Sequence, residues 1–329
     1  MLLPTSTLHT TADFELEKGG RFEALDIAYE TYGTLAEDGS NAILLGHGYT
    51  SNPHAGDSGG WWEELIGPGR AIDTDRFCVI ASNMIGSSYG STGPAHTDPD
   101  TGQVYGLSFP DITTGDMVAA QCRLIDHLGI GQLAAVVGFS YGGYLTFEWG
   151  TRHPERMRAL APVATAISGR GDPASVTALI DRFAACPGWN GGDYYANKKD
   201  SGVYDVLVDM RVETLTNYGI AKQLEDTVAD PDERTRQMRA MAAGWAEEFD
   251  ANSLIALRKA AILYDAKPRA AAIKAPMLYV LSRTDALFPP SLGPETVDYL
   301  AGVGVSAEYH ALDSAYGHRG PSVDWAKWG

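Results

Sequence analysis

The chain has 329 residues, of which 44% are hydrophobic and 20% are charged, and its formal net charge at pH 7 is −17. This length allows one large domain or two small ones with a sizeable core, and the composition is that of an ordinary globular enzyme. The strongly negative charge argues against a nucleic-acid backbone or an anionic membrane as a partner.

The first half of the chain alternates short apolar runs with helical segments. We expect helices at 114–128 and 142–153, the first with apolar residues at helical spacing and Gly129 as its stop. Strands alternating with helices indicate an α/β fold with a mainly parallel sheet covered by helices on both faces. The expected strands are residues 22–32, 41–46, 77–82, 133–137 and 158–165.

The pattern changes over residues 167–265, which contain no convincing buried strand. We interpret this block as a helical lid inserted into a core domain made of residues 1–166 and 266–329. Such a lid would exclude water and shape the substrate pockets; a decoration or a dimer surface is the alternative. Helices are expected in it at 173–185, 221–226, 230–248 and 252–264; beyond it we expect strands at 276–281 and 305–312 and a helix at 291–302.

The segment after the strand at 133–137 carries the most informative motif. Residues 138–143 read GFSYGG, which places Ser140 in a G-x-S-x-G sequence between a strand and a helix. This context is typical of the nucleophile elbow of α/β-hydrolases. Small neighbours permit the sharp turn, which exposes Oγ and points backbone N–H groups at a reacting carbonyl. An idle serine in a glycine-rich turn is the alternative.

Two further residues complete a triad in the chain order Ser, Asp, His that is typical of this fold. Asp285 closely follows the strand at 276–281, and His318 lies in the loop after the last expected strand. His318 would act as general base, and Asp285 would orient it. Either side chain could instead be an ordinary surface residue.

The strand at 41–46 runs into the loop HGYT, the expected place for an oxyanion-hole donor. We expect His47 to shape this loop. His47 and His54 are seven residues apart in a loop and fit no zinc spacing well, so no metal is expected. The chemistry of the triad needs no cofactor.

Three cysteines, Cys78, Cys122 and Cys186, are widely spaced. An odd, sparse set predicts free thiols in a reducing compartment, and therefore a cytoplasmic protein. The N-terminus lacks the basic and apolar segments of a signal peptide, and no apolar run approaches the length of a membrane span.

Several short motifs resemble the homoserine O-acetyltransferase family of α/β-hydrolases. The resemblance covers nearly the whole chain and implies an α/β-hydrolase core with a helical lid, often as a homodimer. It also implies that Ser140 accepts the acyl group and that the N–H groups of Tyr49 and Tyr141 bind the oxyanion. The motifs are AYETYG at 28–33, NMIG at 83–86, YGSTGP at 89–94, YGLSFP at 105–110, DHLG at 126–129, WNGGDYY at 189–195, FDANS at 249–253 and LFPP at 287–290.

The chain departs from that family in the candidate substrate pocket. Arg319 stands where the family has an acid that helps hold the amino group of homoserine. Met210 aligns with the lid arginine that binds the homoserine carboxylate. Arg211 is one residue further, about 100° around a helix, so it is expected to point elsewhere. With His47, these residues are the candidate pocket residues, and they predict poor binding of a zwitterion.

The sequence therefore predicts a serine hydrolase that cleaves small, acetyl-type esters through an acyl-enzyme on Ser140, with a small-molecule ester and water as its partners. The alternative is an acetyl-CoA-dependent O-acetyltransferase that acts on homoserine or another alcohol with the same triad. A non-catalytic binding protein on a hydrolase scaffold is disfavoured by the intact Ser, Asp and His set.

Overall fold

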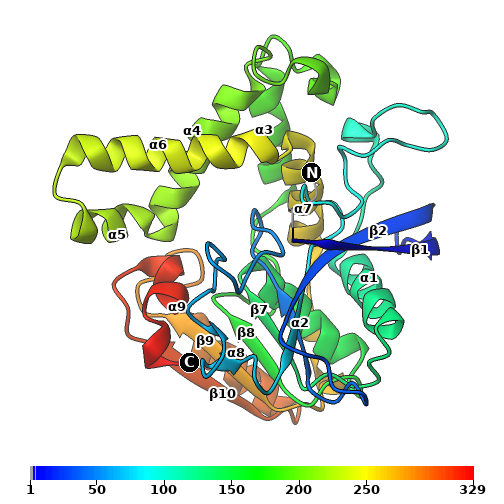
Figure 1. The fold of residues 1–329 in the computed structure, drawn as a ribbon, viewed down its shortest axis with the longest axis vertical. Coiled ribbons are helices and arrows are strands. Elements are labelled where there is room, and N and C mark those ends of the chain that lie inside the picture. Colours follow the sequence, from blue (N-terminus) through cyan, green and yellow to red (C-terminus); the bar gives the residue numbers. More distant parts are fainter. Residues whose placement is uncertain (1–2, 4) are drawn as a thin grey trace.

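One eight-stranded sheet runs through the computed structural model, which describes residue 3 and residues 5–329. Its strands are β1 (Thr7–Glu15), β2 (Arg21–Tyr32), β3 (Ala42–Gly46), β6 (Cys78–Ser82), β7 (Ala135–Phe139), β8 (Leu160–Val163), β9 (Met277–Ser282) and β10 (Ala307–Leu312), and a separate pair is formed by β4 (Ile66–Gly67) and β5 (Ile72–Asp73). The order in the sheet is β1-β2-β6-β3-β7-β8-β9-β10. In this order, each neighbouring pair from β6 through β3, β7, β8 and β9 to β10 is parallel, whereas β2 pairs antiparallel with both β1 and β6. The sheet is therefore mainly parallel, as predicted (Figure 1).

The edge strand β1 has no counterpart in the sequence-based prediction. Its side chains are mostly exposed, and Phe14 is its one buried residue. An edge strand with both faces largely in water has no alternation of apolar and polar residues to reveal it.

Nine α-helices connect or follow these strands in the described part of the chain. They are α1 (Thr114–His127), α2 (Tyr141–Arg152), α3 (Pro173–Ala184), α4 (Val203–Tyr218), α5 (Ile220–Thr227), α6 (Pro231–Glu248), α7 (Ala251–Leu263), α8 (Leu292–Gly302) and α9 (Gly320–Val323), with short 3₁₀ turns η1 (Gly106–Ser108), η2 (Asn190–Gly192), η3 (Tyr195–Asn197), η4 (Lys267–Ala272), η5 (Gly317–Arg319) and η6 (Trp325–Lys327). Local chemistry sets several helix starts. Thr113 and Asp116 form a capping box on α1, and Asp172, Asp230 and Asp250 cap α3, α6 and α7.

The core lies on both faces of the sheet, because successive strand residues point to opposite sides. Leu44 and Val136 join the larger cluster with α1, α2 and α8. Leu45 and Val137 join a smaller cluster around Trp62, against which the C-terminal Trp325 and Trp328 pack. The strands that carry the candidate site residues are thus fixed from both sides.

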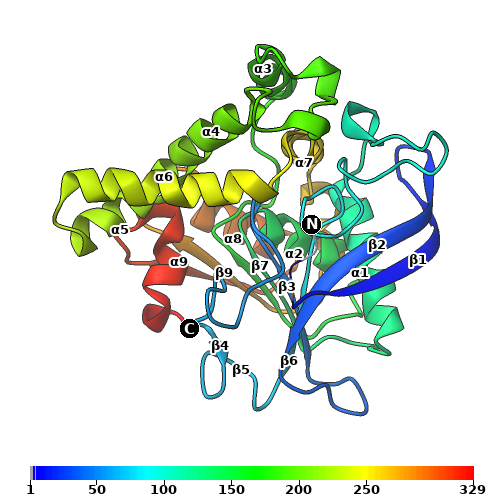
Figure 2. The same cartoon turned by 45° about the horizontal axis from the view of Figure 1, so that its top comes forward.

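Helices α3 to α7 gather at one end of the sheet, and α4, α5 and α6 extend away from it (Figures 1 and 2). The helix α4 was not predicted from sequence, although it carries Met210 and Arg211. Only four of its sixteen residues are buried, so its apolar pattern is weak. The α4 helix ends at Gly219, whose left-handed φ of 98° closes it. The division into core and lid remains a prediction.

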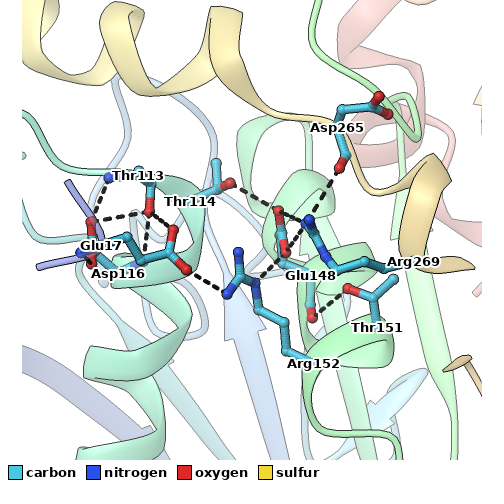
Figure 3. A network of polar contacts seen from close by, with 9 residues as sticks. All are labelled: Glu17, Thr113, Thr114, Asp116, Glu148, Thr151, Arg152, Asp265 and Arg269. Atoms are coloured by element: carbon cyan, nitrogen blue, oxygen red, sulfur yellow. Dashed lines mark hydrogen bonds and ion pairs between the residues drawn. The ribbon is translucent and has the colours of Figure 1, made fainter.

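A buried carboxylate ties the helix α2 to the segment that follows α7. Glu148 of α2 accepts hydrogen bonds from Arg152 Nε at 2.5 Å and from Arg269 Nη2 at 2.9 and 3.0 Å. Thr114 at the start of α1 donates to the same carboxylate, and Arg152 also pairs with Glu17 (Figure 3). Since only 2% of the Glu148 side chain is exposed, its charge depends on these partners.

Candidate active site

Ser140 occupies a strained turn between β7 and α2. Its φ of 57° and ψ of −113° lie in a region that non-glycine residues rarely adopt. The backbone is held there by the N–H of Ser140, which donates to Val163 O at 2.8 Å, and by the N–H of Gly143, which donates to Ser140 O. The side chain is 7% exposed and lines a cavity. This is the geometry expected of a nucleophile elbow.

Close backbone contacts explain the glycines around Ser140. A Cβ atom on Gly142 would lie 2.1 Å from Gly46 O, and one on Gly138 would lie 2.0 Å from Gly142 O. On Gly143 it would lie 2.3 Å from Thr165 Cγ2. The helix α2 therefore approaches β3 and β7 more closely than any side chain allows, which confirms the sequence-based reason for these residues.

Asp285 and His318 form a buried pair at the same end of the sheet. His318 Nδ1 lies 2.7 Å from Asp285 Oδ2, and the other carboxylate oxygen accepts the N–H groups of Leu287 and Phe288 at 2.8 and 3.1 Å. A carboxylate partner places the imidazole proton on Nδ1, which leaves Nε2 as an acceptor. The residues that sequence analysis selected are thus brought together as expected; their catalytic roles belong to the proposal below.

The imidazole of His318 is enclosed by aromatic rings. The ring of Phe139, the residue before Ser140, lies 4.9 Å from it, as does that of Tyr218 on α4, and the ring of Phe288 lies 5.6 Å away. Nε2 is buried and has no hydrogen-bond partner among the residues that the structure describes. It is therefore free to accept a proton.

The loop after β3 runs against Ser140. A Cβ atom on Gly48 would lie 3.6 Å from Ser140 Cβ, and Tyr49 follows directly. Tyr141 is the first residue of α2, where a backbone N–H has no partner within its helix. These two N–H groups are the sequence-based candidates for the oxyanion hole, and both belong to segments in contact with the nucleophile.

His47 supports this loop from behind. It is 1% exposed, its Nδ1 lies 2.8 Å from Gly48 O, and the N–H of Met84 donates to its Nε2 at 3.3 Å. Burial lowers the pKa of His47 to about 4, so the ring is neutral at pH 7. His47 lies outside the lining of both cavities that contain Ser140, so its place is that of a loop support, and not of a pocket residue.

Asn83 lies beside His47. Its Oδ1 faces His47 Nε2 at 3.1 Å, and its Nδ2 is buried with no partner among the described residues.

A cavity of about 530 Å³ opens in front of Ser140 between the sheet and the helices α4 and α7. Both Met210 and Arg211 line it, so the expectation that Arg211 points elsewhere is wrong. The reason is the width of a guanidinium on a long stem: side chains on adjacent helix positions can both reach one broad cavity. Tyr49, Tyr141, Tyr144 and Tyr218 add most of its aromatic wall.

Arg211 is held rigidly in this cavity. Its Nη1 donates to Thr50 Oγ1 at 2.7 Å, and its guanidinium lies over the ring of Trp245, 5.0 Å from the centroid. Trp245 in turn donates from Nε1 to Thr50 O at 3.1 Å. Burial lowers the pKa of Arg211 from its usual value, although the group stays a cation at neutral pH.

Arg319 lies at a smaller cavity of about 120 Å³, which shares Ser140, Tyr49 and Arg211 with the larger one. The Nε atoms of Arg211 and Arg319 are both buried without a hydrogen-bond partner in the part of the chain that is described. Sequence analysis selected both arginines; Arg170 and Arg258, which also line the larger cavity, were missed. No motif marks them, and only the fold brings them to the site.

Among residues 3 and 5–329, no group of three or more His, Cys, Asp or Glu side chains could hold a metal ion. None of the described helices has the length and hydrophobicity needed to span a membrane.

A parallel sheet with a strained serine after one strand and an Asp–His pair after two later strands defines an α/β-hydrolase. A family model of the alpha/beta hydrolase fold matches residues 41–316. A homoserine O-acetyltransferase from Geobacter sulfurreducens is 39% identical over 93% of this chain and 89% of that protein. Another, from Methanosalsum zhilinae, is 34% identical over 96% of this chain and 69% of that protein. The chain belongs to the homoserine O-acetyltransferase family of α/β-hydrolases.

Solved structures with both activities in their names resemble this fold. The homoserine O-acetyltransferase of Bacillus anthracis has a TM-score of 0.86 at 26% identity, over 98% of this chain and 95% of that one. Esterase E22 has a TM-score of 0.84 at 27% identity, over 98% of this chain and 96% of that one. The fold alone therefore does not separate transfer from hydrolysis.

Proposed function

We propose that this protein is an O-acyltransferase, which forms an acyl-enzyme on Ser140 and passes the acyl group to the hydroxyl of a small anionic alcohol. The observation that carries this proposal is Arg211, a rigidly held cation in the cavity of the nucleophile, with no carboxylate partner among residues 3 and 5–329. The names of the curated relatives support an acetyl group and a homoserine-like acceptor.

In the first half-reaction, Ser140 Oγ attacks the carbonyl of an activated donor such as acetyl-CoA. His318 Nε2 takes the hydroxyl proton and gives it to the leaving thiolate. Asp285 holds the imidazole and stabilises its protonated form. The N–H groups of Tyr49 and Tyr141 bind the oxyanion of the tetrahedral intermediate.

In the second half-reaction, the acceptor hydroxyl takes the place of the departed thiol. His318 Nε2 removes its proton as the hydroxyl oxygen attacks the acyl-enzyme, and then returns the proton to Ser140 Oγ when the new ester leaves. Arg211 supports transfer over hydrolysis because a carboxylate bound to it would hold the hydroxyl in place, and orientation lets a dilute alcohol compete with water.

Hydrolysis, which the sequence-based expectation placed first, is the second candidate, and the resemblance to esterase E22 favours it. Two departures from the family favoured hydrolysis. The first, the absence of a lid arginine at Met210, loses its force because Arg211 lines the cavity. The second, the cation of Arg319, concerns the identity of the acceptor and does not exclude an acceptor.

The test is product analysis. The protein is incubated with acetyl-CoA, alone and with a panel of hydroxy acids that includes homoserine, and the products are separated by mass spectrometry. We expect an O-acetyl ester to exceed free acetate with at least one acceptor. The Ser140→Ala variant should form neither ester nor acetyl-enzyme, with a loss of roughly 10³-fold or more. Acetate as the dominant product with every acceptor would favour the hydrolase.

A further inference from the structure

The cavity of Ser140 is positively charged although the chain as a whole is strongly negative, at −17. Arg170, Arg211 and Arg258 line the larger part and Arg319 the smaller part. No aspartate or glutamate among the described residues lines either part, and none of the four arginines takes part in an ion pair there. A cavity lined by arginines and by no acidic residue favours the binding of an anion.

Arg211 and Arg319 are the two arginines that line the smaller part of this cavity. Both line the 120 Å³ cavity with Ser140, and the Nε atom of each is buried and unpaired within the described chain. Besides burial, the charge of Arg211 lowers the pKa of Arg319, as expected of two cations near each other. Two neighbouring half-buried guanidiniums, each with a buried and unpaired Nε atom, would be stabilised by a ligand that supplies a counter-ion.

Arg319 also lines a second cavity, together with Glu63 and Glu64. Neither glutamate forms an ion pair with it in the part of the chain described, and the Glu63 carboxylate accepts the N–H of Gly59 at 2.6 Å. Arg319 therefore has no direct carboxylate partner among these residues, and its charge is available to a molecule bound beside Ser140.

We propose that the acceptor alcohol carries two anionic groups and no ammonium group, as a hydroxy dicarboxylate does. This inference rests on the proposed acyl transfer at Ser140. Arg211 would bind one carboxylate and Arg319 the other, because guanidinium and carboxylate form strong paired hydrogen bonds. An ammonium group in the second position would face the Arg319 cation and be repelled.

The size of the cavity assigns the two anionic groups to the acceptor. A volume of about 120 Å³ holds a molecule of a few carbon atoms and excludes a nucleotide thioester. Arg319 also follows His318 directly in the chain, in the 3₁₀ turn η5 that carries the proposed base. Arg170 and Arg258, which line only the wider part, are left for the acyl donor.

Three acceptors that share one hydroxyethyl arm test the proposal: 2-(2-hydroxyethyl)malonate, 4-hydroxybutyrate and homoserine. At the carbon that bears the shared carboxylate, the first carries a second carboxylate, the second a hydrogen and the third an ammonium group. With acetyl-CoA as donor, we expect kcat/KM to fall in that order, by roughly tenfold or more at each step. Homoserine as the best acceptor would overturn the proposal. Acetate alone with all three would overturn acyl transfer itself, and this proposal with it.

Variants assign the preference to its side chain. Arg319→Gln should reduce the ratio of kcat/KM for 2-(2-hydroxyethyl)malonate to kcat/KM for homoserine by roughly tenfold or more. Arg319→Glu should make homoserine the better acceptor of the two. Arg123→Gln, which removes an exposed arginine of α1, is the matched control and should keep the ratio. An unchanged ratio in Arg319→Gln would overturn the proposal.

A binding measurement covers the case in which the Arg319 variants do not fold. In the Ser140→Ala background, which prevents turnover, 2-(2-hydroxyethyl)malonate should raise the Tm of the protein more than homoserine does at the same concentration. An equal or larger shift with homoserine would contradict the proposal.

Discussion

Tyr49 and Tyr141 lie with their rings parallel, the centroids 5.9 Å apart and the planes 8° from each other. Both hydroxyls donate to carbonyl oxygens of α7, that of Tyr49 to Leu254 O at 2.5 Å and that of Tyr141 to Leu257 O at 3.0 Å. The side chains of the two proposed oxyanion donors therefore hold α7. Burial raises the pKa of Tyr49 to about 12, so its phenol remains a donor.

The first prediction concerns these phenols. Tyr49→Phe and Tyr141→Phe should each lower the free energy of unfolding by about 1 kcal/mol, the usual worth of a buried hydrogen bond. They should also lower kcat more than they change KM, because the loop and the elbow lose a common anchor. Urea denaturation and steady-state kinetics measure the two effects. Tyr204→Phe, which removes a hydroxyl bound to Ala243 O on α6, is the control and should leave kcat unchanged.

The second prediction concerns the close contact of α2 with β3. Gly142→Ala places a methyl group 2.1 Å from Gly46 O, a backbone atom that cannot move aside. We expect a loss of roughly 3 kcal/mol or more in the free energy of unfolding, together with loss of activity. Gly244→Ala in α6 meets nothing within 4 Å and should stabilise the protein by up to about 1 kcal/mol. Similar Tm values for the two variants would contradict this account of the elbow.

The third prediction concerns pH. His47 has a folded-state pKa of about 4, below its usual value of 6.5, because burial disfavours the charged ring. The unfolded chain binds this proton as the pH falls through 6.5, and the folded protein does not. Stability is therefore complete above pH 6.5 and is lost between pH 6.5 and 4, by about 2 kcal/mol from pH 7 to pH 5. Denaturation of the His47→Gln variant at pH 7 and pH 5 should show a loss of unfolding free energy that is smaller by that amount than the loss in the unmodified protein. An unchanged pH dependence would mean that His47 is charged in the fold.

The fourth prediction concerns the buried carboxylate of α2. Glu148→Gln weakens the hydrogen bonds to Arg152 and Arg269, whose side chains are 26% and 42% exposed and can turn to water. We expect a loss of about 2 kcal/mol, within the range for charged hydrogen bonds. Glu23→Gln removes an exposed pair with Arg21 at 3.5 Å and should change stability by less than about 0.5 kcal/mol. Thermal unfolding compares the two; equal losses would show that burial of Glu148 adds nothing.

The parallel strands and the elbow could be predicted from sequence because their signals are local. Apolar runs such as that of β7 have a recognisable pattern, and Ser140 follows at a fixed place. The strand β1 and the helix α4 were missed because both bury few of their residues. Their stability comes from partners elsewhere in the chain, which a window of sequence does not contain.

The candidate site shows the same limit. Asp285 and His318 could be selected because each follows a strand, the buried β9 and the half-buried β10, and the two strands end at the same edge of the sheet. The direction of Arg211 could not, since it depends on Trp245 and Thr50, and Thr50 is 161 residues away. The missing counter-ion of Arg319 is a property of the whole surroundings, and no stretch of sequence reports it.

The segment of residues 251–272 forms hydrogen bonds with α2, the helix that follows Ser140, at two points. Leu257 of α7 holds Tyr141 at the first residue of α2, and Arg269 of η4 holds Glu148 two turns later. A flap that swung about residue 265 would break the contact of Leu257 with Tyr141 and leave that of Arg269, which lies beyond the hinge. Since that movement would disturb the first residue of α2, we expect entry to the cavity to come from displacement of α4 and α6 against a stationary α7. In deuterium exchange, the amides of α7 should then be protected as long as those of β7, while those of α4 exchange earlier.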